Sequence, residues 1–334
     1  MPTLRKFLEK INIDAEIDFD EPMANHTSFR IGGPADALVL PRSTDDLARL
    51  LVAAESEGIP VAVIGGGANL LVADAGVRGV VVCTSLLRRF EVEATGDNLG
   101  AAGSGPAAAG GDPEATGGYM VRVGAGLPVT ELLARLLELG LSGLEFAAGL
   151  PGSVGGAVYM NARCYEHEIA DLLDSVFYLD SVAHQPRHTG MQRQHWAYKR
   201  TPFMPGGTLE GAVVTGARFR LQHGDKALMT ARMAELEADR QAKGHFDNPC
   251  AGSLFKNDRC FGRPTGQILD ELGFRGRRIG DAMVSRKHAN IFVNAGRASA
   301  MDMLALVSEA QAAAQKAFGF ELEPEVVRLG DFSR

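Results

Sequence analysis

The sequence has only four cysteines, at positions 83, 164, 250 and 260, and no two of them form a CxxC pair. This is far below the cysteine density of a small disulfide-stabilised secreted domain, so we expect reduced thiols. Basic charge is not in excess either, because 34 Lys and Arg stand against 41 Asp and Glu, giving a formal net charge of -7. A chain without a basic patch does not favour nucleic acid or a membrane surface as a partner.

Long hydrophobic runs are also missing. No window reaches the length of a membrane span, and the first residues, MPTLRKFLEKINIDAEIDFD, alternate charges without an apolar run of signal-peptide length. We therefore expect a cytoplasmic protein, and we expect a monomer. No cluster of His, Cys and carboxylate residues has the spacing of metal ligands, so no metal is predicted.

The remaining composition is that of a globular chain with room for more than one domain. The 334 residues exceed what one core usually organises, and 46% of them are hydrophobic. The run from Ser43 to Gly58 has a hydroxyl cap, acids in its first turn and apolar residues on one face, so it predicts a helix. The segment at 94–118 is rich in Gly, Ala and Pro, and we expect a mobile loop outside the active site.

Strands are expected at PVAVIGGG, VRGVVVC and YMVRVGAGL, and a helix at PVTELLARLLELG.

The glycines of GGGANLL, residues 65–71, would let backbone N–H groups approach a pyrophosphate closely. A nicotinamide-type Rossmann motif fits poorly, because Leu70 occupies the third glycine position and another strand follows. A purely structural turn remains an alternative. A second glycine-rich stretch, GLEFAAGLPGSVGGAVYMNA at 143–162, has almost no charge, and together the two stretches favour a bound dinucleotide.

Eight segments, in order, then carry a family resemblance over nearly the whole chain. They are NHTSFRIGGPAD, VIGGGANLLVADAGVRGVVV, VRVGAGLPVTELL, GLEFAAGLPGSVGGAVYMNA, YKRT, CAGSLFKN, GFRGRRIGDAMVSRKHANIFVN and FGFELEPEV. In these segments the sequence resembles the UDP-N-acetylenolpyruvoylglucosamine reductases (UDP-N-acetylmuramate dehydrogenases), flavoenzymes of bacterial peptidoglycan synthesis. The interval from Tyr198 to Ser253 is short, which is typical of the subclass without an extra tyrosine-bearing loop.

The resemblance implies an α+β fold made of an FAD-binding module of the vanillyl-alcohol-oxidase type, with two α/β subdomains, and a smaller C-terminal α+β substrate domain. We expect an N-terminal helix at 1–20, the FAD module at 21–222 with subdomains at about 21–90 and 119–222, and the substrate domain at 223–334. The implied cofactor is tightly bound FAD, with NADPH as the hydride donor. Residues implied to contact FAD are Gly65, Gly66, Gly67, Ala68, Asn69, Leu70, Gly149, Pro151, Gly152, Ser153, Gly155, Gly156 and Ala157.

The implied reaction reduces UDP-N-acetylglucosamine enolpyruvate to UDP-N-acetylmuramate. Hydride passes to C3 of the enol ether, and Ser253, by resemblance, protonates C2. Glu325 matches the glutamate that polarises the enol, and a positioned cation would stabilise the developing charge. The implied substrate-binding residues are Tyr198, Lys243, Lys256, Asn257 and Gln267. His288 is more typical of a structural histidine, and we leave it outside the catalytic set.

The sequence departs from the family pattern at the cation. Members usually read Tyr-Arg-x-Ser, whereas this chain has Tyr198-Lys199-Arg200-Thr201, so either Lys199 substitutes or Arg200 serves after a shift of one residue. Lysine and arginine bind a carboxylate differently, and we favour Arg200. A second departure is Arg163-Cys164, where members generally have Gly-Ala. Two alternatives stay open: another FAD oxidoreductase with the same module, and a noncatalytic UDP-sugar-binding relative.

Overall fold

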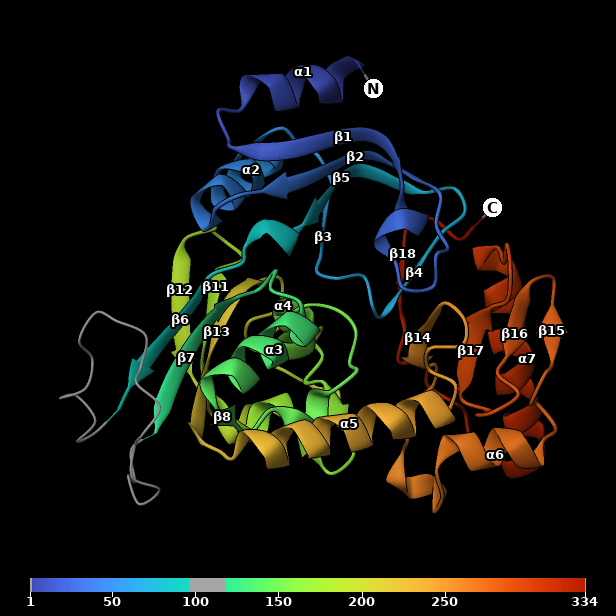
Figure 1. Cartoon of the computed structure of the whole chain (residues 1–334). Helices are drawn as coiled ribbons and strands as arrows, with labels where there is room; N and C mark the ends of the chain where they lie inside the picture. The colour runs from blue at the N-terminus through green and yellow to red at the C-terminus, as the bar shows by residue number, and fades with distance from the viewer. Residues whose placement is uncertain (1, 96–117, 334) are drawn as a thin grey trace. The chain divides into compact units, whose positions relative to one another are not determined.

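The structure is a computed structural model that describes residues 2–95 and 118–333 (Figure 1). The predicted mobile loop at 94–118 lies almost entirely outside these residues. Contacts divide the chain into two compact units. The first consists of Met1–Pro41, Arg49–Cys83 and Glu237–Arg334, and the second of Arg42–Ala48 and Thr84–Leu236. The first unit thus joins both ends of the chain, and the predicted boundary at 222/223 stays a prediction.

The N-terminal part of the first unit is built on a four-stranded sheet in the order β1-β2-β5-β3. Its strands are β1 (Ala15–Pro22), β2 (Pro34–Pro41), β5 (Val77–Cys83) and β3 (Val61–Ile64). Strand β1 is antiparallel to β2, and the other pairs are parallel. The apolar core of this part contains Met23, Leu38, Val72 and Val81.

The predicted helix at 1–20 is too long. Helix α1 covers Pro2–Lys10, and Ala15–Pro22 form strand β1 instead. From Ala15 to Asp20, apolar residues alternate with acidic ones, and this period of two places each kind on one face of a strand. The helix predicted from Ser43 is confirmed as α2 (Thr44–Ser56): Ser43 Oγ accepts a hydrogen bond from the Asp46 N–H at 3.0 Å.

The C-terminal part of the first unit has an antiparallel sheet in the order β14-β17-β16-β15. The strands are β14 (Cys250–Ser253), β17 (Ile291–Asn294), β16 (Ala282–Val284) and β15 (Arg278–Ile279), and helices α6 (Thr265–Glu271) and α7 (Ala300–Phe318) accompany them. Buried Met303 and Leu306 of α7 share a core cluster with Ile291 and Phe292 of the sheet. A further parallel pair joins β18 (Val327–Leu329) to β4 (Leu70–Val72), directly after the first glycine cluster.

The second unit is organised by one antiparallel sheet in the order β12-β11-β13-β7-β6, with β8 also paired to β13 (Figure 1). The strands are β12 (Pro186–Gly190), β11 (Leu173–Leu179), β13 (Val213–His223), β7 (Tyr119–Gly124), β6 (Phe90–Ala94) and β8 (Leu141–Ser142). Helices α3 (Val129–Leu139) and α4 (Val154–Tyr159) pack in the core of this unit. Helix α5 (Lys226–Ala242) begins in the second unit and ends in the first.

Several sequence-based predictions are confirmed in these elements. Helix α3 lies where PVTELLARLLELG predicted it, with Pro128 before its first residue and Gly140 in the left-handed conformation (φ 68°) after its last. The four cysteines are free thiols.

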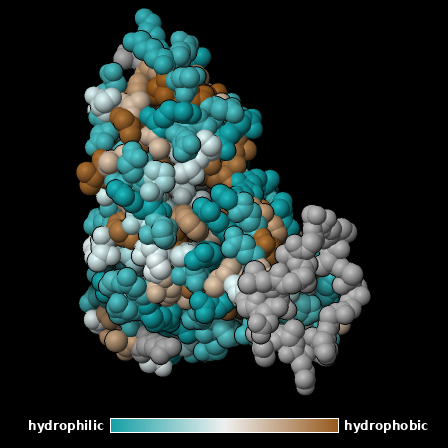
Figure 2. Space-filling view, turned by 90° about the vertical axis from the view of Figure 1, so that its left-hand side faces the viewer, coloured by the Kyte–Doolittle hydropathy of each residue, from teal (hydrophilic) through white to brown (hydrophobic). Residues whose placement is uncertain are grey.

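On the face that Figure 2 shows, apolar residues are scattered among polar ones. Within the described part of the chain, no helix is long and apolar enough to cross a bilayer.

Candidate functional site

The first glycine cluster forms the turn between β3 and β4 in the first unit. Gly67 has a positive φ of 63°, and a Cβ on it would lie 1.8 Å from the carbonyl oxygen of His26. The Ser28 N–H donates to Gly67 O at 3.1 Å, and Ser28 Oγ donates to Ala68 O at 3.2 Å. Glycine is therefore required at 67 by both backbone conformation and close packing. The strand after this turn confirms that the cluster does not open a Rossmann helix.

This turn is bonded to the segment that carries Glu325. Asn69 Nδ2 donates to Glu325 O at 3.1 Å, and the Val327 N–H donates to Asn69 O at 3.0 Å. The parallel pairing of β18 with β4 continues this contact, with Val327 opposite Leu70. The structure therefore brings the predicted cofactor turn next to the predicted catalytic glutamate, although they are far apart in the sequence.

Ser253 lies at the end of β14, next to the same glutamate segment. The Glu325 N–H donates to Leu254 O at 2.7 Å, so Glu325 is paired with the residue that follows the serine. A bridge between Phe255 and Pro324 extends this pairing. Both Ser253 and Glu325 are half-buried. Among the hydrogen bonds of residues 2–95 and 118–333, none involves Ser253 Oγ, which leaves this hydroxyl able to donate to a ligand.

Asn290, a residue that the sequence analysis missed, fixes the backbone after Ser253. Its side chain accepts from the Phe255 N–H at 2.9 Å and donates to Phe255 O at 2.8 Å, while its carbonyl accepts from the Leu254 N–H at 2.8 Å. Asn290 is 1% exposed. The Asn290 N–H in turn donates to His288 Nδ1 at 3.2 Å. Burial, with Lys243 and Arg275 nearby, lowers the pKa of His288, which keeps its ring neutral and able to accept this bond.

The predicted substrate-binding residues of the first unit differ in their polar partners and in their exposure to solvent. Lys256 forms an ion pair with Glu323, and Lys243 Nζ lies 2.6 Å from Asp239 Oδ2. Asn257 Oδ1 accepts from the Thr265 N–H at 2.9 Å, at the start of α6, so this side chain also has a structural function. Gln267 is exposed on α6. Their contacts with substrate stay predictions.

The second glycine-rich stretch lies around α4 in the second unit. Gly149 and Gly152 have positive φ values of 70° and 99°. A Cβ on Gly155 would lie 2.7 Å from Ala125 Cβ, so packing within the protein explains this glycine. Gly156 differs: apart from its own helix, a Cβ there would meet only Ser153 Oγ, at 3.8 Å. Packing does not explain Gly156, which favours the alternative that a ligand approaches the backbone there.

Tyr198, Lys199 and Arg200 lie on a tight turn of the second unit. Ala197 and Arg200 exchange two backbone hydrogen bonds of 3.0 Å, and Lys199 has a φ of 53°. Lys199 is 8% exposed, whereas Arg200 is exposed. Removing a cation from water costs free energy, so a buried lysine is the stronger candidate for a functional cation. Burial therefore favours Lys199, the reverse of our sequence-based preference.

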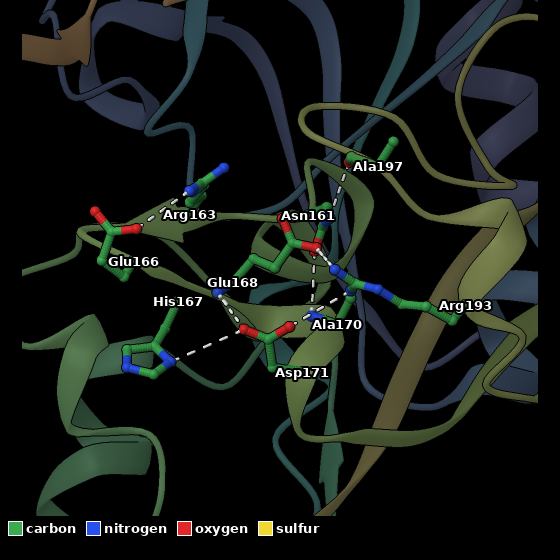
Figure 3. A network of polar contacts seen from close by, with 9 residues as sticks. All are labelled: Asn161, Arg163, Glu166, His167, Glu168, Ala170, Asp171, Arg193 and Ala197. Atoms are coloured by element: carbon green, nitrogen blue, oxygen red, sulfur yellow. Dashed lines mark hydrogen bonds and ion pairs between the residues drawn. The ribbon is translucent and has the colours of Figure 1, made fainter. Parts of the chain in front are cut away.

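A polar network fixes this turn from one side (Figure 3). Asn161 is fully buried; its Nδ2 donates to Ala197 O at 2.9 Å, and its Oδ1 accepts from the Ala170 N–H at 3.1 Å. Arg193 lies 2.6 Å from Glu168 Oε1 and 3.5 Å from Asp171 Oδ1. On the other side, Thr201 Oγ1 donates to Tyr159 O at 2.9 Å. The position of Lys199 is thus set by side chains to which the sequence analysis assigned no role.

The two glycine-rich segments fit a dinucleotide cofactor chemically. Neither 65–70 nor 149–157 carries a charged side chain, so a pyrophosphate would meet no carboxylate from these residues. Backbone N–H groups without neighbouring side chains are suitable donors to such an anion. Metal binding has no comparable support: within residues 2–95 and 118–333, no group of three or more potential His, Cys, Asp or Glu ligands occurs.

Comparison with known families agrees with this chemistry. The family model described as "FAD binding domain" matches residues 35–185, and together with the fold it defines a flavin-binding oxidoreductase. The model described as "UDP-N-acetylenolpyruvoylglucosamine reductase, C-terminal domain" matches residues 244–329. The chain is 37% identical to the UDP-N-acetylenolpyruvoylglucosamine reductase of Treponema denticola, over 96% of this chain and 95% of the relative. The corresponding enzyme of Agathobacter rectalis is 39% identical over 94% of both chains.

A solved structure supports the same assignment. The crystal structure of UDP-N-acetylenolpyruvylglucosamine reductase from Thermus caldophilus matches with a TM-score of 0.71 and 30% identity, over 95% of this chain and 99% of that one. The chain therefore belongs to the UDP-N-acetylenolpyruvoylglucosamine reductase family. The predicted family, the α+β fold class with its FAD-binding module, and FAD as cofactor are confirmed.

Proposed function

We propose that this chain reduces UDP-N-acetylglucosamine enolpyruvate to UDP-N-acetylmuramate with electrons from NADPH, a step of peptidoglycan precursor synthesis. Family membership over nearly the whole chain supports this function. The observation that carries it is the pairing of the Ser253 and Glu325 segments, where Glu325 N–H donates to Leu254 O at 2.7 Å.

FAD would be held by residues 65–70 and by 149–157, with Gly156 as the glycine most open to a ligand. A bound FAD would supply the hydride chemistry that links NADPH to C3 of the enol ether. The protein must then manage the negative charge that this transfer leaves at C2 and in the adjacent carboxylate. Donors placed to meet charge that develops only in the transition state are each worth about 3 kcal/mol.

The proposed proton donor is Ser253. Its hydroxyl gives a proton to C2, and the alkoxide regains one from water, because an uncompensated alkoxide is costly. The half-buried Glu325 would polarise the enol either as the neutral acid or through a water molecule, since a bare carboxylate beside an enolate would repel it. We assign the stabilising cation to Lys199 in preference to Arg200, on the difference in burial.

The remaining assignments concern binding. We propose that Tyr198, Lys243, Lys256, Asn257 and Gln267 contact the substrate or the phosphates of NADPH. The acidic net charge of -7 supports small-molecule partners over nucleic acid or anionic membranes. Since the proposed substrate is a nucleotide sugar, we also propose that the enzyme works in the cytoplasm. We further propose that it is a monomer.

An anaerobic titration tests this function. The purified protein is reduced with NADPH until its visible flavin absorbance is lost, and UDP-N-acetylglucosamine enolpyruvate is then added. We expect one oxidised flavin to reappear for each enolpyruvyl molecule consumed. UDP-N-acetylglucosamine, which lacks the enol ether, is the control and should leave the flavin reduced.

Other outcomes separate the alternatives. Bleaching by NADPH without recovery would indicate another FAD oxidoreductase with the same module. A protein that binds the UDP-sugar but is not reduced by NADPH would be a noncatalytic relative. NADH in place of NADPH measures the preference for the hydride donor.

A further inference from the structure

Arg163 lies beside the Tyr198–Lys199 turn of the second unit. It opens strand β9 (Arg163–Cys164), which pairs with β10 (His167–Glu168). Its guanidinium carbon is 5.7 Å from the centroid of the Tyr198 ring, and Lys199 Nζ is 5.9 Å from the same centroid. Two cations therefore lie next to one aromatic ring, and the Arg163 side chain is only 23% exposed.

Among the carboxylates drawn in Figure 3, only that of Glu166 pairs with Arg163. Glu168 and Asp171 pair with Arg193, at 2.6 and 3.5 Å. Arg163 points away from both, and its ion pair is a long one with Glu166, at 3.9 Å. Glu166 is 91% exposed, so water screens this contact. The guanidinium can turn to a better acceptor with little loss.

The backbone that presents Arg163 is coupled to the backbone that presents Tyr198. Asn161, two residues before Arg163, has a φ of 41° and donates from Nδ2 to Ala197 O at 2.9 Å. Thr201 Oγ1 donates to Tyr159 O at 2.9 Å, which joins the same two segments a second time. These bonds fix the backbones that carry Arg163, Tyr198 and Lys199 relative to one another. A binding site for a small planar anion requires such fixed positions.

We propose that Arg163 binds the carboxylate of the enolpyruvyl group together with Lys199, and so sets the specificity of the enzyme for that group; this inference rests on the proposed function. A guanidinium offers two parallel N–H donors to a carboxylate, whereas an ammonium acts as a point charge. Arg163 therefore supplies the planar recognition that Lys199 lacks. The carboxylate is also what distinguishes the substrate and its product from UDP-N-acetylglucosamine.

The test compares two ligands on the oxidised holoenzyme. UDP-N-acetylmuramate carries the carboxylate and UDP-N-acetylglucosamine does not, and both dissociation constants are measured by calorimetry. For Arg163→Ala we expect affinity for UDP-N-acetylmuramate to fall by about thirtyfold, the size of a lost charge-assisted pair. Affinity for UDP-N-acetylglucosamine should change by less than about twofold, and Arg163→Lys should recover part of the loss.

The matched control is Arg232→Ala, which removes an exposed arginine of α5 that pairs with Glu235 at 2.7 Å. It should change neither constant, and an unaltered flavin spectrum shows that each variant is folded. Equal losses for both ligands, or no loss for either, would overturn the role of Arg163, as would a wild-type enzyme that binds both equally. Failure of the proposed function would give a different result, because the flavin of the wild-type protein would then not be reoxidised by the enolpyruvyl substrate in the NADPH titration.

Discussion

The serine segment at 250–257 and the lysine turn at 197–201 position their functional side chains in different ways. In the serine segment, the backbone of Leu254 is bonded on both sides, to Asn290 and to Glu325. In the lysine turn, the chain reverses within two residues, and Lys199 has a positive φ of 53°. Side chains hold that turn from outside, through Asn161 and Thr201.

This difference decides what sequence can predict. In a paired strand each residue has a fixed side and a fixed neighbour, and here the family resemblance alone assigned Ser253. In a tight turn two consecutive cations can have opposite environments, and here Lys199 is 8% exposed while Arg200 is exposed. The order of letters in YKRT does not contain that information.

The largest expected effect tests the serine segment. Ser253→Ala should slow reoxidation of the flavin by the enolpyruvyl substrate by about a thousandfold, because proton donation to C2 is lost. Reduction by NADPH should stay within about twofold of wild type, since no proton from Ser253 is needed for it. Stopped-flow absorbance of the two half-reactions, measured separately, checks this split. An equal loss in both would remove Ser253 from the role of proton donor.

A smaller effect is expected in the lysine turn. Lys199→Met should lower the rate of reoxidation by about a hundredfold, because a buried charge that meets the developing enolate is removed. Arg200→Met, the matched change one residue on, should cost at least tenfold less. Single-turnover reoxidation of the two variants measures the difference.

The reverse ranking of these two variants would restore Arg200 as the cation and contradict the assignment from burial. Lys199→Arg is a further discriminating variant. If the site accepts the larger guanidinium, activity should stay closer to wild type than in Lys199→Met, because the charge is kept.

Local patterns in the sequence predicted individual helices and strands, the family resemblance predicted the fold class, and neither predicted the residues that support the site. The helix from Ser43 and the strand after the glycine turn followed from periodicity and caps. Strand β1 was missed because the N-terminal segment was assigned one helix, although apolar and acidic residues alternate from Ala15 to Asp20. Asn161 and Asn290 had no local signal, since each bonds to backbone distant in sequence. Such contacts depend on tertiary structure, which a single sequence does not reveal.

The smallest effect concerns how acid acts on the serine segment. Strand β14 begins at Cys250, whose thiol contacts His245 O at 3.4 Å. Burial, followed by the charges of Arg240, His288 and Lys243, lowers the pKa of His245 from 6.5 to about 3, and Asp239 opposes this only in part. The folded protein thus keeps His245 neutral at a pH where the unfolded chain protonates it.

The sign of the pH dependence follows from this shift. Between pH 6.5 and about 3 the unfolded state binds more protons at His245 than the folded state, so stability falls as pH falls through this window. One group contributes at most about 1.4 kcal/mol per pH unit. His245→Gln should make the loss of unfolding free energy between pH 7 and 4.5 shallower, as measured by urea denaturation. His195→Gln, which changes an exposed histidine of the second unit, should leave that loss as in wild type. If His245→Gln and His195→Gln instead changed this loss of unfolding free energy equally, the idea would be wrong. Burial of His245 would then not make the serine segment more acid-sensitive than the lysine turn.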